Sequence, residues 1–274
     1  MKKSIFSLAS VAAISLAMTA CEPDYLGTNE GGDGEPAVTV YTFEPELPYS
    51  SDNDLKVRIM ANNQTTSVYL LADKEGGNFS ADRIVSEGKK YDVTLQQDGS
   101  YSFDAYMTDM QGDYVIAAVG VNGSARSEVR STNFKGLIWT DICKGTYTFN
   151  GKIAALGQPE SAQTSLQKCE NVANLYRFTN LFGEGYSLKF YGTGSKDADE
   201  EGSFEFIYVP ANKTPYTHAS YGEIGARDVY TWQGNNEDYL NGQMYDDGTI
   251  YIWMQYFVSA GSLGYGWEDF APNN

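Results

Sequence analysis

Short segments of alternating apolar and polar residues, separated by turn residues, are the feature that most constrains the fold of this chain. The pattern begins near residue 37 and continues through most of the 274 residues. Asp98-Gly99 and Asn122-Gly123 are typical of two-residue hairpin turns. No long segment has the 3.6-residue period of an amphipathic helix. The sequence therefore predicts an all-β protein.

The first part of the pattern, residues 37–135, predicts a β-sandwich, because about seven short strands follow one another within a hundred residues. A short helical turn is expected where Ser80 is a plausible N-cap and Gly88 a stop. The predicted strands are 37–43, 54–60, 67–73, 91–95, 101–107, 113–121 and 126–132.

The segment GDYVIAAVGVNGSARS resembles the last hairpin of a fibronectin type III or immunoglobulin-like domain. The resemblance implies an immunoglobulin-like β-sandwich over 37–135, with Tyr114 in the position of the corner tyrosine. It also implies that Val115, Ala117 and Val119 face the core.

Residues 136–274 predict a second, aromatic-rich β-sandwich or barrel-like domain. This region holds all four tryptophans and 13 of the 21 tyrosines, and no fixed-period repeat links it to the first domain. A glycine-rich coil is expected after residue 259. The predicted strands are 145–151, 164–170, 175–180, 186–192, 203–210, 227–234 and 249–259.

The first 20 residues predict a secretory signal peptide. Lys2 and Lys3 precede an apolar stretch, and Met18-Thr19-Ala20 places small residues before Cys21. This layout resembles the lipobox of bacterial lipoproteins, which implies cleavage before Cys21 and lipidation of its thiol. The alternative is an ordinary cleavage site followed by a chance cysteine.

Residues 21–36 are acidic and rich in glycine and proline, and they predict a flexible tether. Glu22 and Asp24 resemble the acidic export signal that sends lipoproteins to the outer face of the outer membrane. We therefore expect a lipid-anchored outer-membrane protein, displayed on the cell surface, whose membrane contact is the N-terminal lipid.

The net charge of −17 argues against nucleic acid as a partner, because the acids are spread along the chain and no basic patch stands out. Such a surface suits neutral or cationic ligands better than acidic polysaccharides. No cofactor motif is present in the sequence.

No catalytic or metal motif is found. His218 is the single histidine, and a loop histidine with structural hydrogen bonds is the favoured interpretation. The acidic run 195–203 lacks the spacing of a calcium loop and predicts a solvated turn. Carboxylates are numerous, so a glycosidase pair is not excluded by count. Neither a catalytic residue nor a metal ligand is assigned.

Cys143 and Cys169 are the cysteines that remain after lipidation, and they enclose a 25-residue loop. A disulfide in an oxidising compartment and two buried thiols are both consistent with this spacing.

Strand 249–259 has two distinct faces. Ile252, Met254, Tyr256 and Val258 form a core-like face, whereas Tyr251, Trp253, Gln255 and Phe257 form the other. Aromatic rings and amides are what a sugar platform uses, although rings more often fill sheet cores. The candidate ligand-binding residues are Trp232, Trp253, Trp267, Asn235 and Asn236.

The second region as a whole, with WTDICKGTYTF, LYRFTNLFGEGYSLKF and DDGTIYIWMQYFVSAGSLGYGWEDF, is similar to the C-terminal domain of accessory lipoproteins of glycan-utilisation systems. The resemblance implies a noncatalytic surface lipoprotein that binds a glycan during capture or uptake. An adhesive or structural protein with a protein partner is the alternative, and a glycoside hydrolase is the third hypothesis.

Overall fold

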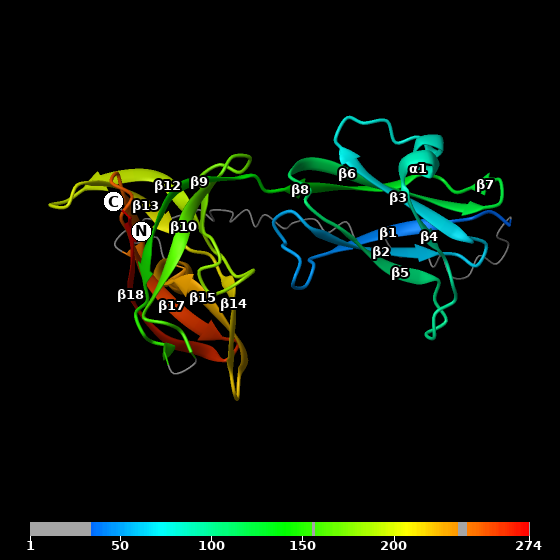
Figure 1. Cartoon of the computed structure of the whole chain (residues 1–274). Coiled ribbons are helices and arrows are strands. Elements are labelled where there is room, and N and C mark those ends of the chain that lie inside the picture. The colour runs from blue at the N-terminus through cyan, green and yellow to red at the C-terminus, as the bar shows by residue number, and fades with distance from the viewer. Residues whose placement is uncertain (1–33, 155–156, 235–239, 274) are drawn as a thin grey trace, which may run out of the picture.

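The computed structural model describes residues 34–154, 157–234 and 240–273, which form two β-rich lobes (Figure 1). We call residues 34–136 the sandwich lobe and residues 139–273 the barrel lobe. Cys21 and the predicted signal peptide lie outside the described residues. Within the described part of the chain, no helix is long and apolar enough to cross a membrane.

The sandwich lobe contains two antiparallel sheets. One has the order β1-β2-β5, and the other has the order β4-β3-β6, with β7 and β8 both pairing with β6. This arrangement is that of an immunoglobulin-like sandwich. The strands are β1 (Val38–Phe43), β2 (Leu55–Ala61), β3 (Ser67–Lys74), β4 (Lys89–Asp92), β5 (Ser102–Met107), β6 (Gly112–Asn122), β7 (Ala125–Arg126) and β8 (Arg130–Gly136).

The core of the sandwich lies between these sheets. Val57 and Ile59 of β2 face Val68 and Leu70 of β3, and all four are buried. Burial of each such side chain contributes about 1.5–3 kcal/mol to folding. This core holds the two sheets together.

Strand β6 is buried on both faces, and the prediction that Val115, Ala117 and Val119 face the core between the sheets is wrong for Ala117 and Val119. Ile116 and Ala118 enter the core between the sheets. Ala117 and Val119 instead pack on the opposite face, in a cluster with Ile84. Helix α1 (Ala81–Glu87) supplies Ile84 and covers this second face. Alternation alone could not show which of two apolar faces meets the other sheet.

Helix α1 begins and ends where the sequence predicts a helical turn. The Ser80 side chain accepts a hydrogen bond from the backbone N–H of Arg83, and the N–H of Gly88 donates to the carbonyl of Ile84. These contacts satisfy polar groups that a short helix leaves open at its ends.

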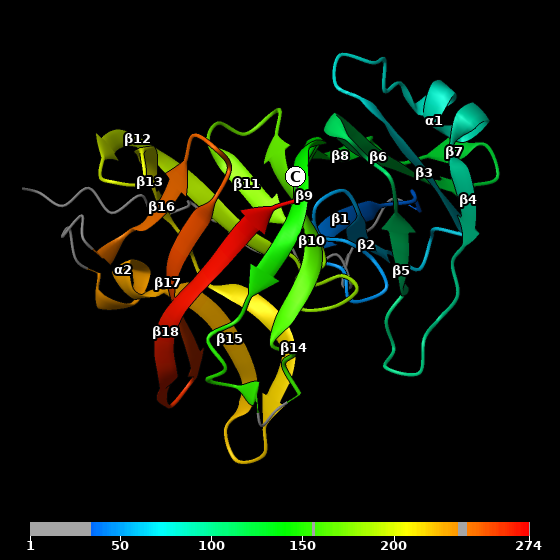
Figure 2. The same ribbon diagram turned by 60° about the vertical axis from the view of Figure 1, so that its left-hand side comes forward.

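The barrel lobe is an eight-stranded antiparallel barrel within the described residues (Figure 2). Strand β18 pairs with β17 along most of its length and with β9 at its C-terminal end, which closes the ring. The strands of the ring are β9 (Trp139–Thr148), β10 (Ser161–Cys169), β11 (Leu175–Phe178), β12 (Leu188–Ala198), β13 (Ser203–Tyr208), β16 (Gly242–Tyr245), β17 (Ile250–Val258) and β18 (Gly261–Pro272).

A hairpin of β14 (Asn212–His218) and β15 (Gly222–Asp228) extends this sheet. Strand β17 pairs with β16 near Ile250 and with β15 near Phe257. The hairpin therefore continues the wall of the barrel beyond the end of β16.

Two local predictions in this lobe are wrong. Of the predicted strand 227–234, only Arg227 and Asp228 are extended, at the end of β15, because the chain then turns into helix α2 (Val229–Gln233) with Asp228 as its cap residue. The expected coil after residue 259 is strand β18. A side chain at Gly266 would approach Asn150 to 2.9 Å, so the glycine reflects close packing rather than a loop.

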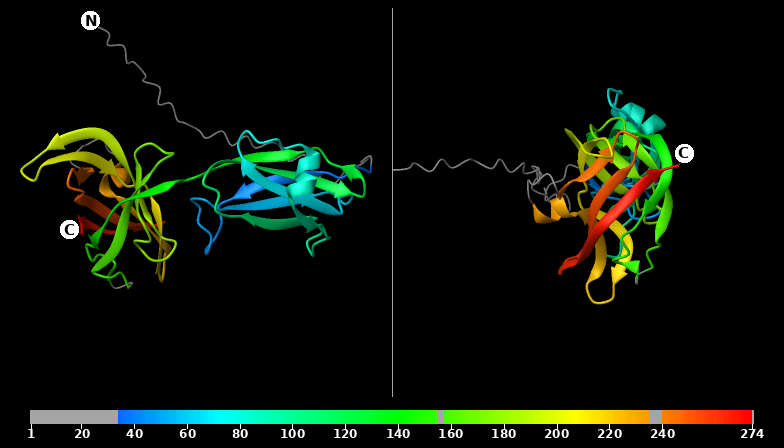
Figure 3. Two further views of the ribbon diagram at one scale, coloured as in Figure 1. Left: turned by 45° about the horizontal axis from the view of Figure 1, so that its top comes forward. Right: turned by 90° about the vertical axis from the view of Figure 1, so that its left-hand side faces the viewer.

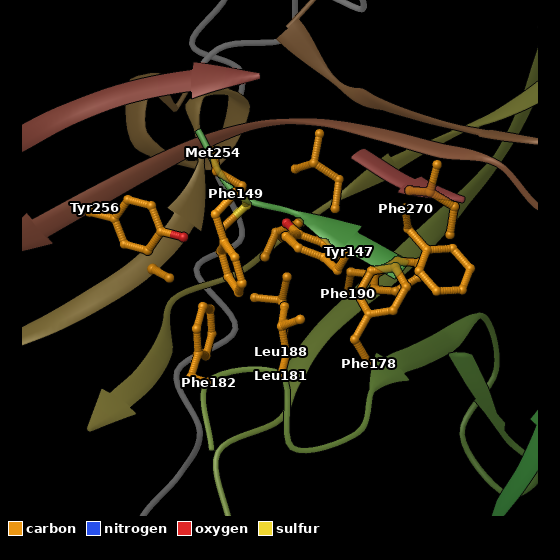
Figure 4. Close-up of a cluster of buried hydrophobic side chains, with 14 of the residues drawn as sticks. Tyr147, Phe149, Phe178, Leu181, Phe182, Leu188, Phe190, Met254, Tyr256 and Phe270 are labelled. Atoms are coloured by element: carbon orange, nitrogen blue, oxygen red, sulfur yellow. The ribbon is translucent and has the colours of Figure 1, made fainter. Parts of the chain in front are cut away.

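The barrel is filled by rings, as Figure 4 shows for Tyr147, Phe178, Phe190 and Phe270. Phe178 packs against Tyr147, Phe190 and Phe270 with ring centroids 4.8–5.3 Å apart. Strand β17 directs Ile252, Met254, Tyr256 and Val258 into this core, as its alternation predicts.

A carboxyl group lies inside the barrel. The hydroxyls of Tyr147 and Tyr256 donate to Glu268 at 2.7 and 2.9 Å, and the Asn150 N–H lies 3.3 Å from it. Burial raises the pKa of Glu268 from 4.5 to about 7, although these hydrogen bonds favour the charged form. The protonated form is therefore the more stable one in the folded state below neutral pH.

The variant Glu268→Gln should flatten the dependence of stability on pH. Because the folded-state pKa is raised, the native protein binds more protons than the unfolded chain between pH 4.5 and 7. Its unfolding free energy should fall by about 3 kcal/mol over that window through this group. This contribution of Glu268 to the fall should be absent from the variant, so urea titrations at several pH values should give a smaller decline.

Glu200→Gln is the matched control, because it removes an exposed carboxyl. Asp228, whose pKa burial raises to about 6, should still cause a decline of the same sign in every variant. An unchanged slope in Glu268→Gln would contradict the buried-carboxylate interpretation.

The two lobes meet at a buried charge. Asp52, which is 5% exposed, binds both Arg177 of β11 and Lys189 of β12. The indole N–H of Trp139 donates to the same carboxylate at 3.0 Å, and the Arg177 guanidinium lies 4.2 Å from the Trp139 ring centroid. Figure 3 shows the two lobes joined end to end by the segment that contains β8 and the start of β9.

Asp52→Ala should loosen this junction. It leaves two partly buried cations without their carboxylate, and we expect the unfolding free energy to fall by about 3 kcal/mol. Small-angle X-ray scattering should also show a wider range of lobe separations.

Glu44→Ala is the control for this experiment, because it removes only the exposed Lys213–Glu44 pair. Loss of that pair should cost less than about 1 kcal/mol. Equal stability and equal scattering of Asp52→Ala and the parent would show that the junction does not depend on Asp52.

Candidate functional site

The outer face of β17 and β18 carries the predicted aromatic platform. Trp253 and Trp267 are direct cross-strand partners, and Gln255 is the partner of Tyr265. Side chains alternate across a strand, so all four belong to the face opposite Ile252 and Met254. Closure of the barrel by β18 thus brings two tryptophans that are 14 residues apart onto one surface.

Four rings form a continuous group, which we call the surface aromatic cluster: Trp232, Trp253, Tyr265 and Trp267. Trp267 stacks on Trp253 with centroids 5.6 Å apart and planes 10° apart. Tyr265 meets Trp253 edge-on at 5.5 Å and contacts Trp232 at 5.8 Å. Trp232 is 37%, Tyr265 44% and Trp267 54% exposed, so three of the rings keep surface for a ligand.

Helix α2 places Trp232 beside the strands (Figure 2). The Asp228 carboxylate accepts hydrogen bonds from the N–H of Thr231 at 2.7 Å and of Val209 at 2.6 Å. It thereby caps the helix and ties it to the end of β13. Gly234 then ends the helix in the left-handed conformation, with φ of 58°.

Polar groups lie beside the cluster. Gln255 is fully buried, and its Oε1 accepts a hydrogen bond of 2.7 Å from the Arg227 Nε. The Arg227 guanidinium lies 4.3 Å from the ring centroid of Phe257. Gln255 Nε2 has no hydrogen-bond partner among the described residues. The face therefore combines rings with a guanidinium that the buried Gln255 amide holds in place.

The other end of the face is acidic. Tyr251 is the cross-strand partner of Asp269. Burial is the main cause that raises the pKa of Tyr251, and the nearby carboxylates of Glu201, Asp269 and Asp247 raise it further. The nearby Tyr245 hydroxyl donates to Asp199 at 2.6 Å. Carboxylates gathered beside the cluster disfavour an anionic ligand.

The structure brings together three of the five predicted ligand-binding residues. Trp232, Trp253 and Trp267 belong to one cluster, whereas Asn235 and Asn236 lie outside the described residues. Tyr265, which joins the tryptophans, was missed because the glycines around it resemble a coil. The alternation of Tyr265 and Trp267 with those glycines was the available signal.

The remaining sequence candidates have local structural contacts. His218 stacks on Tyr221 at 4.8 Å, and its Nδ1 accepts the Ser220 N–H at 3.1 Å. Asp199 accepts the N–H of Glu201 in the predicted acidic turn. No group of three or more histidine, cysteine, aspartate or glutamate side chains within residues 34–154, 157–234 and 240–273 is placed to hold a metal ion.

Cys143 and Cys169 are free thiols in this structure. They lie on paired strands, but Cys143 is opposite Leu166 and Cys169 is opposite Trp139. This register separates them by about 10 Å along the strands, beyond the reach of a disulfide. Cys169 is buried, and its thiol lies 3.2 Å from the Asn171 Oδ1.

The geometry of the cluster suits binding. Exposed indole and phenol rings offer apolar faces that stack on flat or apolar ligand surfaces. The strands beneath them are fixed by the barrel core, so the rings are held before a ligand arrives. Glu268, the carboxyl with a pKa of about 7, is sealed inside the barrel rather than near the cluster surface.

Comparisons with known proteins leave the family open. No family model matches the chain, and no curated protein matches it. Among solved structures, the chain is similar to a Kfla1895 mutant in complex with cyclobis-(1->6)-alpha-nigerosyl, with 10% identity and a TM-score of 0.28. The match covers 87% of this chain and 33% of the Kfla1895 chain, so this chain spans about a third of the length of that protein. A likeness this weak defines neither a fold nor a ligand here.

The stacked tryptophans should be energetically coupled. Trp267→Ala should destabilise the protein by about 1 kcal/mol, because the ring is largely exposed. Trp253→Ala should cost about 3 kcal/mol, since this ring is enclosed by its neighbours. A double-mutant cycle in urea should give a coupling of about 0.5–1.5 kcal/mol. Additive effects of the two substitutions would contradict the stacked arrangement.

Proposed function

We propose that this protein is a noncatalytic cell-surface lipoprotein that binds a glycan through the surface aromatic cluster, as an accessory to capture or uptake. The observation that carries the proposal is the contiguity of three rings that are 37–54% exposed, Trp232, Tyr265 and Trp267, around a half-buried Trp253. Large exposed rings gathered at one place mark binding sites on soluble domains.

A glycan fits this surface better than other ligands. The C–H faces of sugar rings are apolar and stack on aromatic side chains, while their hydroxyls need polar partners. The half-buried Arg227 lies beside the rings, and the buried amide of Gln255 holds its Nε in place. The carboxylates near Tyr251 and the net charge of −17 disfavour polyanions, so the glycan is neutral rather than acidic.

The surface location is proposed from the N-terminal sequence. Lys2 and Lys3, the apolar stretch and Cys21 have the layout of a lipoprotein signal. Several acyl chains on Cys21 would give stable anchorage to the outer membrane. The acidic segment that follows would let the lobes stand away from the lipid.

The protein-partner alternative has its own surface. Tyr41, Phe43, Met60 and Tyr106 are each 37–45% exposed and lie on the outer face of the β1-β2-β5 sheet. Helix α1 covers the corresponding face of the other sheet. A docking protein would therefore meet the sandwich lobe, whereas a glycan would meet the cluster on the barrel lobe.

Binding to a panel of polysaccharides tests the proposal. Purified protein should be retarded in native gels that contain one neutral polysaccharide of the panel. Trp267→Ala should weaken that binding roughly two- to tenfold, because loss of one stacking ring costs about 0.5–1.5 kcal/mol. The double variant Trp232→Ala/Trp267→Ala should abolish the retardation.

Tyr41→Ala is the matched control, since it removes an exposed ring on the other lobe. Equal loss in Tyr41→Ala and Trp267→Ala would place the ligand elsewhere. Retention of binding in the folded double variant would also contradict the proposal. Absence of retardation by every polysaccharide would favour the protein partner.

A further inference from the structure

A groove begins at the junction between the lobes and continues along the barrel lobe, away from the surface aromatic cluster. It consists of three adjoining hollows of about 300, 650 and 640 Å³. The first and second share Ser187 and Lys189, and the second and third share Ala211 and Glu223. Its ends lie at Trp139 and at Phe257.

Part of the groove wall is fixed before any ligand binds. Lys189 is held by the buried Asp52, whereas the Lys213–Glu44 pair at 2.9 Å is exposed and adds little. The Asn212 amide accepts the N–H of Lys189 at 2.8 Å and donates to its carbonyl at 3.0 Å. Hollows of this size are common ligand sites, and two of the three lie where the lobes meet.

The charge of the groove points to an uncharged ligand. Four carboxylates line it, from Glu44, Glu46, Asp52 and Glu223, against three cations, Arg177, Lys189 and Lys213. The difference is −1, in a chain whose net charge is −17. All three cations already pair with Asp52 or Glu44. An anionic ligand would therefore find no free cation there.

The lining is nevertheless rich in rings and in acceptors. The lining includes four rings, of Tyr49, Tyr186, Tyr221 and Phe257. Tyr221 is the most exposed at 53%, although one of its faces stacks on His218. The Glu46 and Glu223 carboxylates can accept hydrogen bonds from hydroxyls. Neither Glu46 nor Glu223 forms an ion pair within the described residues. Rings together with free acceptors suit a ligand that has both apolar faces and many hydroxyls.

We propose that the junction groove is a second binding site, distinct from the surface aromatic cluster, and that it takes a neutral oligosaccharide. Phe257 lies on the same face of β17 as Trp253, about 13 Å along the strand. Arg227 and the buried Gln255 lie between them. The two sites are therefore separate surfaces, and each can be blocked without the other.

Blocking the groove tests the proposal. Ala211 is exposed and lines two of the three hollows, so Ala211→Trp fills the groove without burying a polar group. Ala198→Trp is the control, since it adds the same ring at an exposed site at the end of β12. Isothermal titration of the full chain with cellohexaose, maltohexaose and oligogalacturonate would measure binding, and circular dichroism would check folding.

At the groove, a neutral oligosaccharide should bind the parent, Ala198→Trp and Trp267→Ala with the same Kd, because Trp267 belongs only to the cluster. Its Kd should rise at least about tenfold in Ala211→Trp, and Tyr221→Ala should weaken binding in the same direction. Oligogalacturonate should bind none of them. Tyr221 is 53% exposed, so its truncation leaves the fold intact and keeps the test valid if Ala211→Trp misfolds.

Other outcomes would overturn the groove proposal. Unchanged binding in both groove variants, with loss only in Trp267→Ala, would leave the cluster as the glycan site and remove the groove. Preferential binding of oligogalacturonate in the groove would contradict the charge argument. Lack of binding by either neutral oligosaccharide would reject the groove, while the gel assay with long polysaccharides would still report on the cluster.

Discussion

Closure of the barrel by β18 is the constraint on which the rest of the structure depends. This strand pairs with β17 on one side and with β9 on the other, so it fixes the register of the first and last parts of the lobe together. Its alternation then assigns two roles to neighbouring residues. Glu268 and Phe270 point into the core, whereas Tyr265 and Trp267 belong to the outer face. The surface aromatic cluster is thus a consequence of the way the ring closes.

The same alternation explains why a carboxyl group is buried in a core of rings. Glu268 lies between Trp267 and Asp269, so a shift of one residue in β18 would exchange the buried and exposed sets. The hydroxyls of Tyr147 and Tyr256 satisfy its oxygens only in the observed register. An unpaired carboxylate among phenylalanines would be costly in any other register. The polar network therefore specifies the position of β18, and with it the position of Trp267.

The sequence was sufficient for the fold class and for much of the first lobe, because short alternating segments and Asx-Gly turns are local signals. It also predicted the caps of α1 at Ser80 and Gly88.

Sequence prediction failed where tertiary packing determines the local structure. Glycines of β18 resemble a coil, yet Gly266 is required by the approach of Asn150. Residues 227–234 have strand-like composition, but Asp228 caps a helix by reaching the N–H of both Thr231 and Val209. The three tryptophans come together because Tyr265 contacts both Trp232 and Trp253 and because β18 closes the barrel. The periodicity of a single strand shows neither contact.

Charge distribution links the junction between the lobes to ligand choice. Each ion pair between the lobes within the described residues joins a base of the barrel to an acid of the sandwich: Arg177 and Lys189 with Asp52, and Lys213 with Glu44. The barrel therefore uses its cations to hold the sandwich, and its own carboxylates around Tyr251 keep no counter-ion among the described ion pairs. An anionic ligand would have to displace these lobe contacts or approach uncompensated acids. A neutral ligand needs neither, because stacking and hydrogen bonding leave the junction intact. The ion pairs that join the two lobes therefore also favour neutral ligands at both the cluster and the groove.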